Sequence, residues 1–140
     1  MNPVISYWYD GSVYTKKYYD PNKRLHRCGG PSVIQYYYHR MGVTNRPAVW
    51  IKQYHRHGKL HKLKGPAEIW YRSDGNVHVE KFYKNGQLYE IVNYAGAGIV
   101  ASRQFYKSKL LHKIDGPVVI VYKNGKIVGR EYYIKGIKIK

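Results

Sequence analysis

The sequence predicts an all-β protein, an elongated and twisted antiparallel meander of tandem β-hairpin repeats. Three observations predict it: a segment that occurs three times, Asn-Gly and Asp-Gly pairs between apolar runs, and an excess of tyrosine. The chain has 17 Tyr against 2 Phe and 3 Trp, and tyrosine suits a pleated surface that is buried on one side. No helical period of convincing length is present. At 140 residues the chain is expected to form one repeat domain, 1–140.

The repeated segment reads "LHRCGGPSVIQY" from Leu25, "LHKLKGPAEIWY" from Leu60 and "LHKIDGPVVIVY" from Leu111. The shared pattern is Leu-His-[Arg/Lys]-x-x-Gly-Pro-[small]-x-Ile-x-Tyr. Its recurrence predicts units that stack on one another, as in one-dimensional repeat proteins. The expected structural repeat residues are His26, Gly30, Pro31, Ile34, Tyr36, His61, Gly65, Pro66, Ile69, Tyr71, His112, Gly116, Pro117, Ile120 and Tyr122.

A second module, Gly-x-[Val/Ile]-x4-[Phe/Tyr]-Tyr, begins at Gly11, Gly75, Gly98 and Gly125, and in stretched form at Gly42. Joined together, the two modules predict units that begin near these five glycines. The third unit lacks its His-Gly-Pro segment. The spacing is irregular, but all units follow one design.

Turns and strand starts follow from local chemistry. The segments "YDG" at Tyr9, "SDG" at Ser73 and "KNG" at Lys84 and Lys123 supply the positive φ angles of tight hairpins, so adjacent strands are expected to be antiparallel. The prolines of the repeat lack an N–H donor and are expected to be the first residues of strands.

Alternation after each proline assigns the two faces of the sheet. Ala67, Ile69 and Tyr71 keep their character from copy to copy, which predicts that this face turns toward the core. Glu68 and Trp70 change freely between copies, which predicts an exposed face. Trp70 is therefore a candidate contact residue.

Segments such as "YKNGQL", "YHRHGKLH" and "YKNGKIVGREYYIKG" resemble MORN repeats, and the resemblance extends from about Gly11 to Lys140. It implies a ladder of β-hairpins used for binding and assembly, without shared catalytic residues. MORN-like proteins are associated with scaffolds next to membranes, protein contacts and acidic-lipid binding. Repeats of the His-x-x-x-Gly-Pro kind are also similar to those that large DNA viruses encode in many copies, which makes a virion component, for example a capsid-associated protein, an expectation.

The histidine that recurs as His26, His61 and His112 is expected to bond a backbone group of the neighbouring turn, because fixed polar groups usually satisfy main-chain atoms. The cluster of His55, His57 and His61 raises metal binding as an alternative. No carboxylate or thiol lies near that cluster in sequence, so we expect no metal site.

Cys28 is the only cysteine, which excludes an internal disulfide and favours a reducing compartment. It occupies the place of Leu63 and Ile114 in the other copies, and is expected to be a small buried hydrophobe. Catalysis is not expected, because the 8 Asp and Glu residues form no repeated pair and the Gly-Pro segments lack the Gly-Lys-Ser/Thr ending of a phosphate loop. We therefore expect no enzyme, no catalytic residue, no cofactor and no small-molecule substrate.

The net charge is +17, from 25 Lys and Arg against 8 Asp and Glu. Solubility alone does not require so much charge, which favours an anionic partner. The candidate residues for binding that partner are Lys16, Lys17, Arg24, Arg27, Arg56, Lys59, Lys62, Lys64, Arg103, Lys107, Lys135, Lys138 and Lys140.

The sequence thus predicts a non-enzymatic structural or adaptor protein, which meets acidic surfaces of other proteins in an assembly through a basic, tyrosine-rich face. One alternative is nucleic-acid binding, with stacking by Trp8, Trp50 and Trp70. Another is peripheral binding to an anionic membrane. The N-terminal segment lacks the pattern of a secretory signal, so an intracellular, non-secreted protein is expected.

Overall fold

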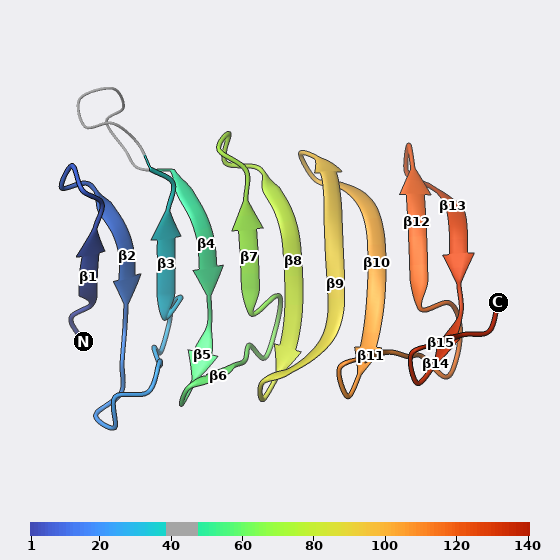
Figure 1. Ribbon diagram of the computed structural model, residues 1–140, viewed down its shortest axis with the longest axis horizontal. Coiled ribbons are helices and arrows are strands. Elements are labelled where there is room, and N and C mark those ends of the chain that lie inside the picture. The colour runs from blue at the N-terminus through green and yellow to red at the C-terminus, as the bar shows by residue number, and fades with distance from the viewer. Residues whose placement is uncertain (39–47) are drawn as a thin grey trace.

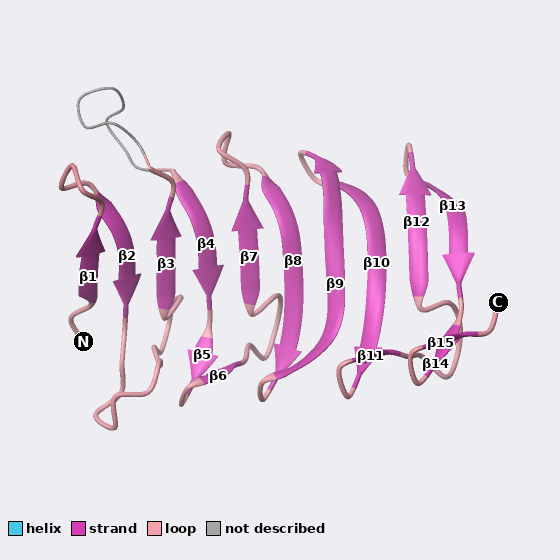
Figure 2. Cartoon of the chain, viewed as in Figure 1, coloured by secondary structure: helices cyan, strands magenta, loops and turns pink. Residues whose placement is uncertain are grey.

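The computed structural model describes residues 1–38 and 48–140. Gly42, the expected start of the second unit, lies outside the described residues. The described chain consists of strands and loops (Figure 2), and none of it forms a helix long and apolar enough to cross a lipid bilayer. The predicted all-β class is confirmed.

One large antiparallel sheet contains most strands, side by side along the long axis of the molecule (Figure 1). The strands of its main path, in spatial order, are β1 (Val4–Tyr7), β2 (Val13–Lys17), β3 (Val33–Tyr36), β4 (Val49–Gln53), β7 (Glu68–Tyr71), β8 (Val77–Lys84), β9 (Gln87–Gly96), β10 (Ile99–Lys107), β12 (Val119–Lys123) and β13 (Lys126–Glu131). The short strands are β5 (His55–Arg56), β6 (Lys59–Leu60), β11 (Leu110–Leu111), β14 (Tyr133–Ile134) and β15 (Ile137–Lys138). Because spatial order follows chain order, the sheet is a meander of hairpins, as predicted.

The predicted units at Gly11, Gly75 and Gly98 each contain the second strand of one long hairpin and the first strand of the next, namely β2 with β3, β8 with β9, and β10 with β12. The hairpins are β1–β2, β3–β4, β7–β8, β9–β10 and β12–β13. Gly11, Gly75, Gly98 and Gly125 lie in the turns at their upper ends, all with positive φ (Figure 1). At the lower end, the Leu-His-x-x-x-Gly-Pro segments link one hairpin to the next, except in the third unit, where β8 turns directly into β9.

The hairpin turns are of two kinds. Asn85 and Asn124 have positive φ together with the glycines that follow them, which is the geometry of a two-residue type I′ turn. At Gly11 and Gly75 only the glycine has positive φ, and the preceding aspartate instead accepts the N–H two residues beyond it, at 3.0 Å for Asp10 and 2.9 Å for Asp74. All four turns thus form hairpins, but the Asp-Gly pairs use one left-handed residue and not two.

The strands begin two residues after each repeat proline, not at the proline as predicted. The residue between them already belongs to the ladder, since the N–H of Ser32 donates to the carbonyl of Gln53 at 2.8 Å, and that of Ala67 to Lys81 at 3.0 Å. The proline therefore ends the loop, and the small residue after it is fully enclosed: Ser32 and Ala67 are both 0% exposed.

A row of directly paired residues crosses one face of the sheet, one residue from each strand of the main path. It alternates without exception between an aliphatic and a charged side chain. The row is Ile5, Lys16, Ile34, Lys52, Ile69, Glu80, Val92, Arg103, Ile120 and Arg130. Long charged side chains cover their aliphatic neighbours with their methylene stems, and charges in the row lie two strands, about 9–10 Å, apart.

The predicted assignment of the faces holds for Ala67, which is 0% exposed, but not for the residues that follow it. Glu68 is only 5% exposed, and its counterparts Val33 and Val119 are 2% and 9% exposed, although this face was expected to be free. Ile69 and Tyr71, expected in the core, are half-buried. The reason is that most strands form one sheet without a second layer, so neither face is covered throughout and burial depends on the neighbours in each row.

Candidate functional site

The lower end of the sheet in Figure 1 carries a series of turns and loops, which we call the basic rim. It comprises residues 20–31, 55–66, 84–87, 107–117 and 133–140. Successive turns are joined by main-chain hydrogen bonds: the N–H of Gly58 donates to Leu25, that of Gly86 to Leu60, and that of Gly136 to Leu111, at 2.8, 2.8 and 3.0 Å. The leucine of the repeat therefore holds the next turn through its carbonyl group.

The repeat histidine binds the same turn next to the leucine. Nδ1 of His26, His61 and His112 accepts the N–H of His57, Asn85 and Lys135, at 3.3, 3.0 and 3.2 Å. This is the backbone contact that the fixed position of the histidine predicts. A neutral ring that accepts through Nδ1 carries its proton on Nε2. The Nε2 atom of His61 is buried and has no hydrogen-bond partner among the described residues.

Replacing His61 by alanine is expected to weaken this junction by about 1 kcal/mol, because the N–H of Asn85 loses its acceptor. Amide hydrogen exchange at Asn85 should become faster, while exchange in β12 stays unchanged. His78→Ala is the control, since His78 is exposed in β8 and should leave the exchange at Asn85 unaltered. Equal effects of both variants would contradict the assigned role of His61.

The Arg or Lys that follows each repeat histidine lies over an aromatic ring. The Arg27 guanidinium is 3.9 Å from the centroid of Tyr18, the Lys62 ammonium 3.9 Å from that of Tyr54, and Lys113 4.2 Å from that of Phe105. Such cation–π contacts contribute on the order of 1 kcal/mol each. Arg27 and Lys62, predicted as binding residues for a partner, therefore also pack the loops against the sheet.

Other predicted binding residues are paired with carboxylates of the same chain. Arg103 lies 2.6 Å from Glu90, and Lys138 lies 2.9 Å from Glu131. Arg24 forms the most extensive pair, with Asp20 at 2.9 Å.

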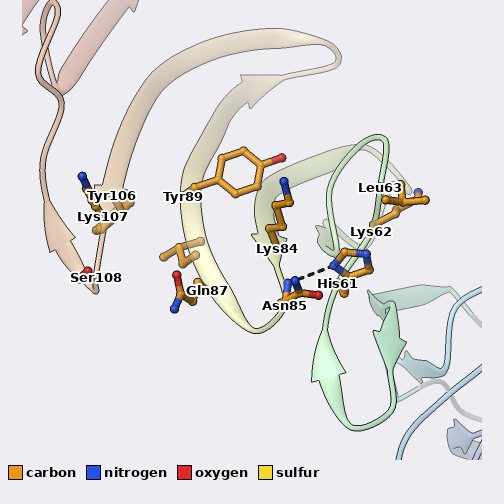
Figure 3. A pocket seen from close by; sticks show the side chains of 11 residues that line it. His61, Lys62, Leu63, Lys84, Asn85, Gln87, Tyr89, Tyr106, Lys107 and Ser108 are labelled. Atoms are coloured by element: carbon orange, nitrogen blue, oxygen red, sulfur yellow. Dashed lines mark hydrogen bonds between the residues drawn. The ribbon is translucent and has the colours of Figure 1, made fainter.

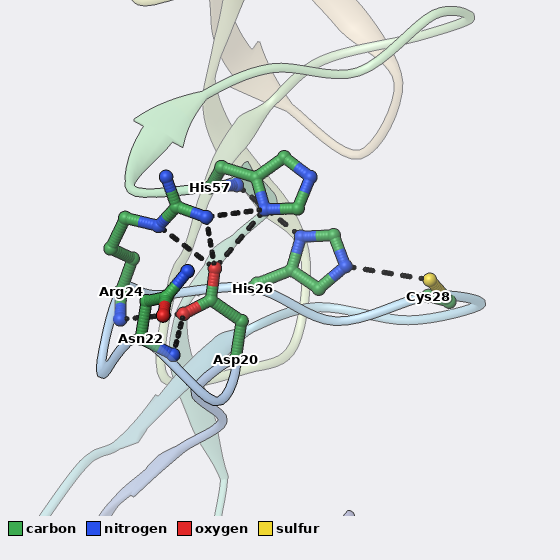
Figure 4. A network of polar contacts seen from close by, with 6 residues as sticks. All are labelled: Asp20, Asn22, Arg24, His26, Cys28 and His57. Atoms are coloured by element: carbon green, nitrogen blue, oxygen red, sulfur yellow. Dashed lines mark hydrogen bonds and ion pairs between the residues drawn. The ribbon is translucent and has the colours of Figure 1, made fainter.

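Asp20 is the centre of a network between the first two units (Figure 4). Its Oδ1 accepts the N–H of Asn22 and Arg24, and its Oδ2 contacts the Arg24 guanidinium and Nδ1 of His57, at 2.9 and 3.1 Å. The His57 ring in turn stacks on that of His26 at 4.4 Å. The N–H of Arg24, with the side chains of His57 and Arg24, holds the pKa of Asp20 well below its ordinary value despite its burial.

The remaining cations of the rim are exposed at its turns. Those predicted from sequence are Arg56, Lys59, Lys64, Lys107, Lys135 and Lys140, and those that sequence reasoning missed are Lys23, Lys84 and Lys109. Their shared signal was available in the sequence, because each lies in or beside a short turn or loop between strands. By contrast, Lys16, Lys17 and Arg103 lie on strands β2 and β10, away from the rim. Of the upper turns, those at Asp10 and Asp74 carry an acidic residue, whereas the β12–β13 turn carries Lys123 and Lys126. Most exposed cations of the described residues lie at the lower end.

A cavity of about 660 Å³ interrupts the rim beside the turn of the third unit (Figure 3). It lies between the loop at His61–Leu63, the β8–β9 turn and the lower end of β10. Lys62, Lys84, Lys107 and Tyr89 are among the residues that line it. In alignment with the other units, Tyr89 stands where the repeat histidine would be. The missing His-Gly-Pro segment thus leaves a hollow with three lysines at its wall.

Trp70, the candidate contact residue, is half-buried and already engaged. Its Nε1 donates to Glu68 at 2.6 Å, its ring meets Trp50 edge to face at 6.0 Å, and the Lys81 ammonium lies 4.9 Å from its centroid. Trp8 similarly packs on Tyr14, with 4.4 Å between ring centroids. Trp8, Trp50 and Trp70 are thus half-buried and each is in contact with another aromatic ring.

Cys28 is exposed, so the prediction of a buried hydrophobe is wrong. Its counterparts Leu63 and Ile114 are also exposed, at 83% and 78%. This loop position points outward because the contacts to the sheet are made by the histidine and the cation before it.

The three clustered histidines have separate partners: His55 bonds Ser32 Oγ at 2.8 Å, His57 bonds Asp20, and His61 bonds Asn85. Among residues 1–38 and 48–140, no three His, Cys, Asp or Glu side chains gather in a way that could hold a metal ion.

Comparison with known proteins finds no matching protein family, no matching curated protein and no matching solved structure.

Proposed function

We propose that this chain is a non-enzymatic, MORN-like repeat protein that acts as a structural or adaptor component of a larger assembly, and that its basic rim binds an acidic surface of another protein. The observation that carries the proposal is the concentration of exposed cations on one end of the sheet. The resemblance of its repeats makes a virus particle the assembly we favour.

The arrangement of the rim supports an extended partner. Main-chain and histidine hydrogen bonds tie the turns of residues 20–87 to one another, and likewise those of residues 107–140, so the cations are presented on two connected stretches of backbone. A partner that bears carboxylates at a similar spacing would meet several of them at once, and such complementary charge raises association rates and fixes register. The lysine-lined cavity beside the third unit offers a place on the rim for an anionic group of that partner.

The tryptophans favour a protein partner over a single-stranded nucleic acid. Binding of single strands draws much of its energy from bases stacked on open aromatic faces, whereas Trp50 and Trp70 pack on each other.

The test compares two matched double variants. Arg56 and Lys59 flank a tight turn of the rim, and Lys123 and Lys126 flank the equivalent two-residue turn at the opposite end of the sheet. Reversing Arg56 and Lys59 to glutamate is expected to weaken binding of an acidic polypeptide, poly-glutamate, about tenfold or more, because charge complementarity is lost. Reversing Lys123 and Lys126 changes the net charge equally and is expected to have a several-fold smaller effect. Titrations followed by fluorescence anisotropy at several salt concentrations would measure both.

The same titration decides between partners. Duplex DNA, single-stranded RNA and vesicles with anionic lipid serve as parallel probes. Preferential binding to a nucleic acid, with a steep logarithmic salt dependence, would replace the proposed partner class, and preferential binding to the vesicles would favour a membrane. Equal losses in both double variants would show that net charge matters and the rim does not.

A further inference from the structure

The sheet has two outer edges, formed by β1 and β13. Strand β1 is built like the interior strands but is exposed. Val4 is 58% exposed, whereas the residues at the same position in β3 and β12, Val33 and Val119, are 2% and 9% exposed. Tyr7 is 59% exposed. Edge strands are usually protected from pairing by lysine or another charged residue, and β1 contains none.

The sequence of β1 identifies the neighbour that it fits. "VISY" matches "VIQY", "EIWY" and "VIVY", the first strands of three other hairpins. Each of those three strands pairs antiparallel with the second strand of the preceding hairpin, namely β2, β4 and β10. Strand β1 therefore has the pattern of a strand that receives a preceding hairpin.

The three internal junctions have the same register. In each, a cation of the preceding hairpin lies directly opposite the repeat isoleucine: Lys16 opposite Ile34, Lys52 opposite Ile69, and Arg103 opposite Ile120. The residues on either side keep the same correspondence. Junctions between hairpins thus follow one rule.

Strand β13 supplies the matching half at the other edge. Arg130 pairs with Ile120 across the hairpin, which gives it the position that Lys16, Lys52 and Arg103 hold in their units. The aliphatic residues of β13 are exposed, with Val128 at 61%. Strand β13 runs in the direction of β2, β4 and β10 (Figure 1), so β1 of another molecule would meet it antiparallel.

We propose that β13 of one molecule pairs with β1 of a second copy of this chain, in the register of the internal junctions. Arg130 then lies opposite Ile5 of the second copy, Glu131 opposite Val4 and Gly129 opposite Ser6. The alternating row of aliphatic and charged residues continues across the boundary without a break. The contact is head-to-tail, so each added copy leaves the same two edges open and the sheet can extend.

Two features set the strength of this contact. Each internal junction has one further hydrogen bond, in which the N–H of Tyr18, Tyr54 or Phe105 donates to the carbonyl of the residue before the paired strand. Tyr132 holds the same position after β13, but its N–H already donates to Lys140 at 2.9 Å, so the proposed contact lacks this bond. The net charge of +17 also opposes association at low ionic strength, because like-charged molecules repel. Self-association is therefore expected to increase with salt, opposite to binding of an anionic partner, and it does not depend on the proposed function.

Cysteine crosslinking tests the register directly. In a Cys28→Ser background, chains with Ile5→Cys are mixed with chains with Arg130→Cys under mild oxidation. Directly opposite residues of antiparallel strands have Cα atoms about 4.5–5.5 Å apart, which is within the range of a disulfide. We expect a covalent dimer of the two different chains, and its yield should increase between low salt and about 0.3 M salt, where charges are screened within about 6 Å.

The control is a mixture of Ile5→Cys with Glu131→Cys, whose side chain points to the opposite face of the strand. It is expected to crosslink at least about tenfold less. Equal yields for both mixtures, or no dimer in either, would overturn the proposal. A dimer formed by Ile5→Cys chains alone would also overturn it, since that product requires two β1 edges to meet. Circular dichroism of each variant confirms that the sheet is intact.

Discussion

Replacing Glu68 by alanine is expected to lower the free energy of unfolding by about 3 kcal/mol, as for removal of one partner from a buried ion pair. The carboxylate accepts three donors: the Lys81 ammonium at 2.8 Å, Trp70 Nε1 at 2.6 Å and Gln53 Nε2 at 2.7 Å. Without it, all three donors stay in a partly dry environment and lose their acceptor. This loss of stability is at the lower end of the range for a buried ion pair, because the Lys81 side chain is 26% exposed. Urea denaturation at neutral pH would measure it.

The control for this prediction is Glu131→Ala. Glu131 lies on the same face and pairs with Lys138, but both side chains are more than a third exposed, so the loss is expected to stay under about 1 kcal/mol. The double variant Glu68→Val, Lys81→Met should recover part of the loss, since it removes charge and acceptor together. If Glu68→Ala costs no more than Glu131→Ala, the buried cluster contributes nothing beyond an exposed ion pair.

The environment of Glu68 also explains why it stays charged. Burial by itself would raise the pKa of this carboxyl, but the hydrogen bonds from Lys81, Trp70 and Gln53 outweigh burial and hold the pKa below its ordinary value of 4.5. A group of this kind contributes stability that is present above pH 4.5 and is lost as the pH falls through its folded pKa.

The sequence was sufficient for the hairpins and for the role of the repeat histidine, because both depend on contacts within one unit or between adjacent units. Turn pairs such as Asn85-Gly86 define the local geometry. The regular position of His61 after Leu60 indicates a repeated structural partner, and the partner is the N–H of Asn85.

The burial of the two faces could not be predicted from one strand at a time. The face of Ile69 keeps its character from copy to copy, which predicted that this face is buried. In a single sheet, however, the burial of a residue depends on which side chains flank it on the neighbouring strands. Glu68 lies between Gln53 and Lys81, two residues that only the register identifies. Cys28 was misassigned for a similar reason, since an apolar counterpart in other copies does not show which way a loop residue points.

The concentration of charge on the rim was likewise not visible in the sequence. Along the chain, the cations are spread almost evenly. The meander brings every second turn to the same end of the sheet, so Arg56, Lys84, Lys107 and Lys135 come together although they are far apart in the chain. A search for cations at alternate turns would have identified Lys84, which reasoning by runs of charge missed.

Replacing Asp20 by asparagine is expected to lower the urea midpoint at pH 7 by on the order of 1 M and to flatten the loss of stability in acid. The amide of asparagine has one acceptor oxygen in place of two, and its NH₂ group would face the donors of Arg24 and His57. In the wild type, the folded pKa of Asp20 is depressed from an ordinary value of 3.8. Its contribution is therefore fully present above pH 3.8 and is lost as the pH falls through the folded pKa.

His55 adds an earlier loss that the Asp20 variant retains. Burial lowers the pKa of His55 from its ordinary value of 6.5, against the opposing charge of Glu68, so the unfolded chain binds the proton first and stability decreases as the pH falls below 6.5. Urea midpoints measured from pH 8 to pH 2 should thus decline in two stages in the wild type, and the second stage should be smaller in Asp20→Asn, where the acid-sensitive contribution of Glu68 remains. Asp74→Asn is the control, because Asp74 is exposed in a turn of the opposite end and one oxygen suffices for its bond to the N–H of Asn76. Equal losses at pH 7 in the two variants would show that the ion pair and the His57 contact of Asp20 add nothing to its role in the turn.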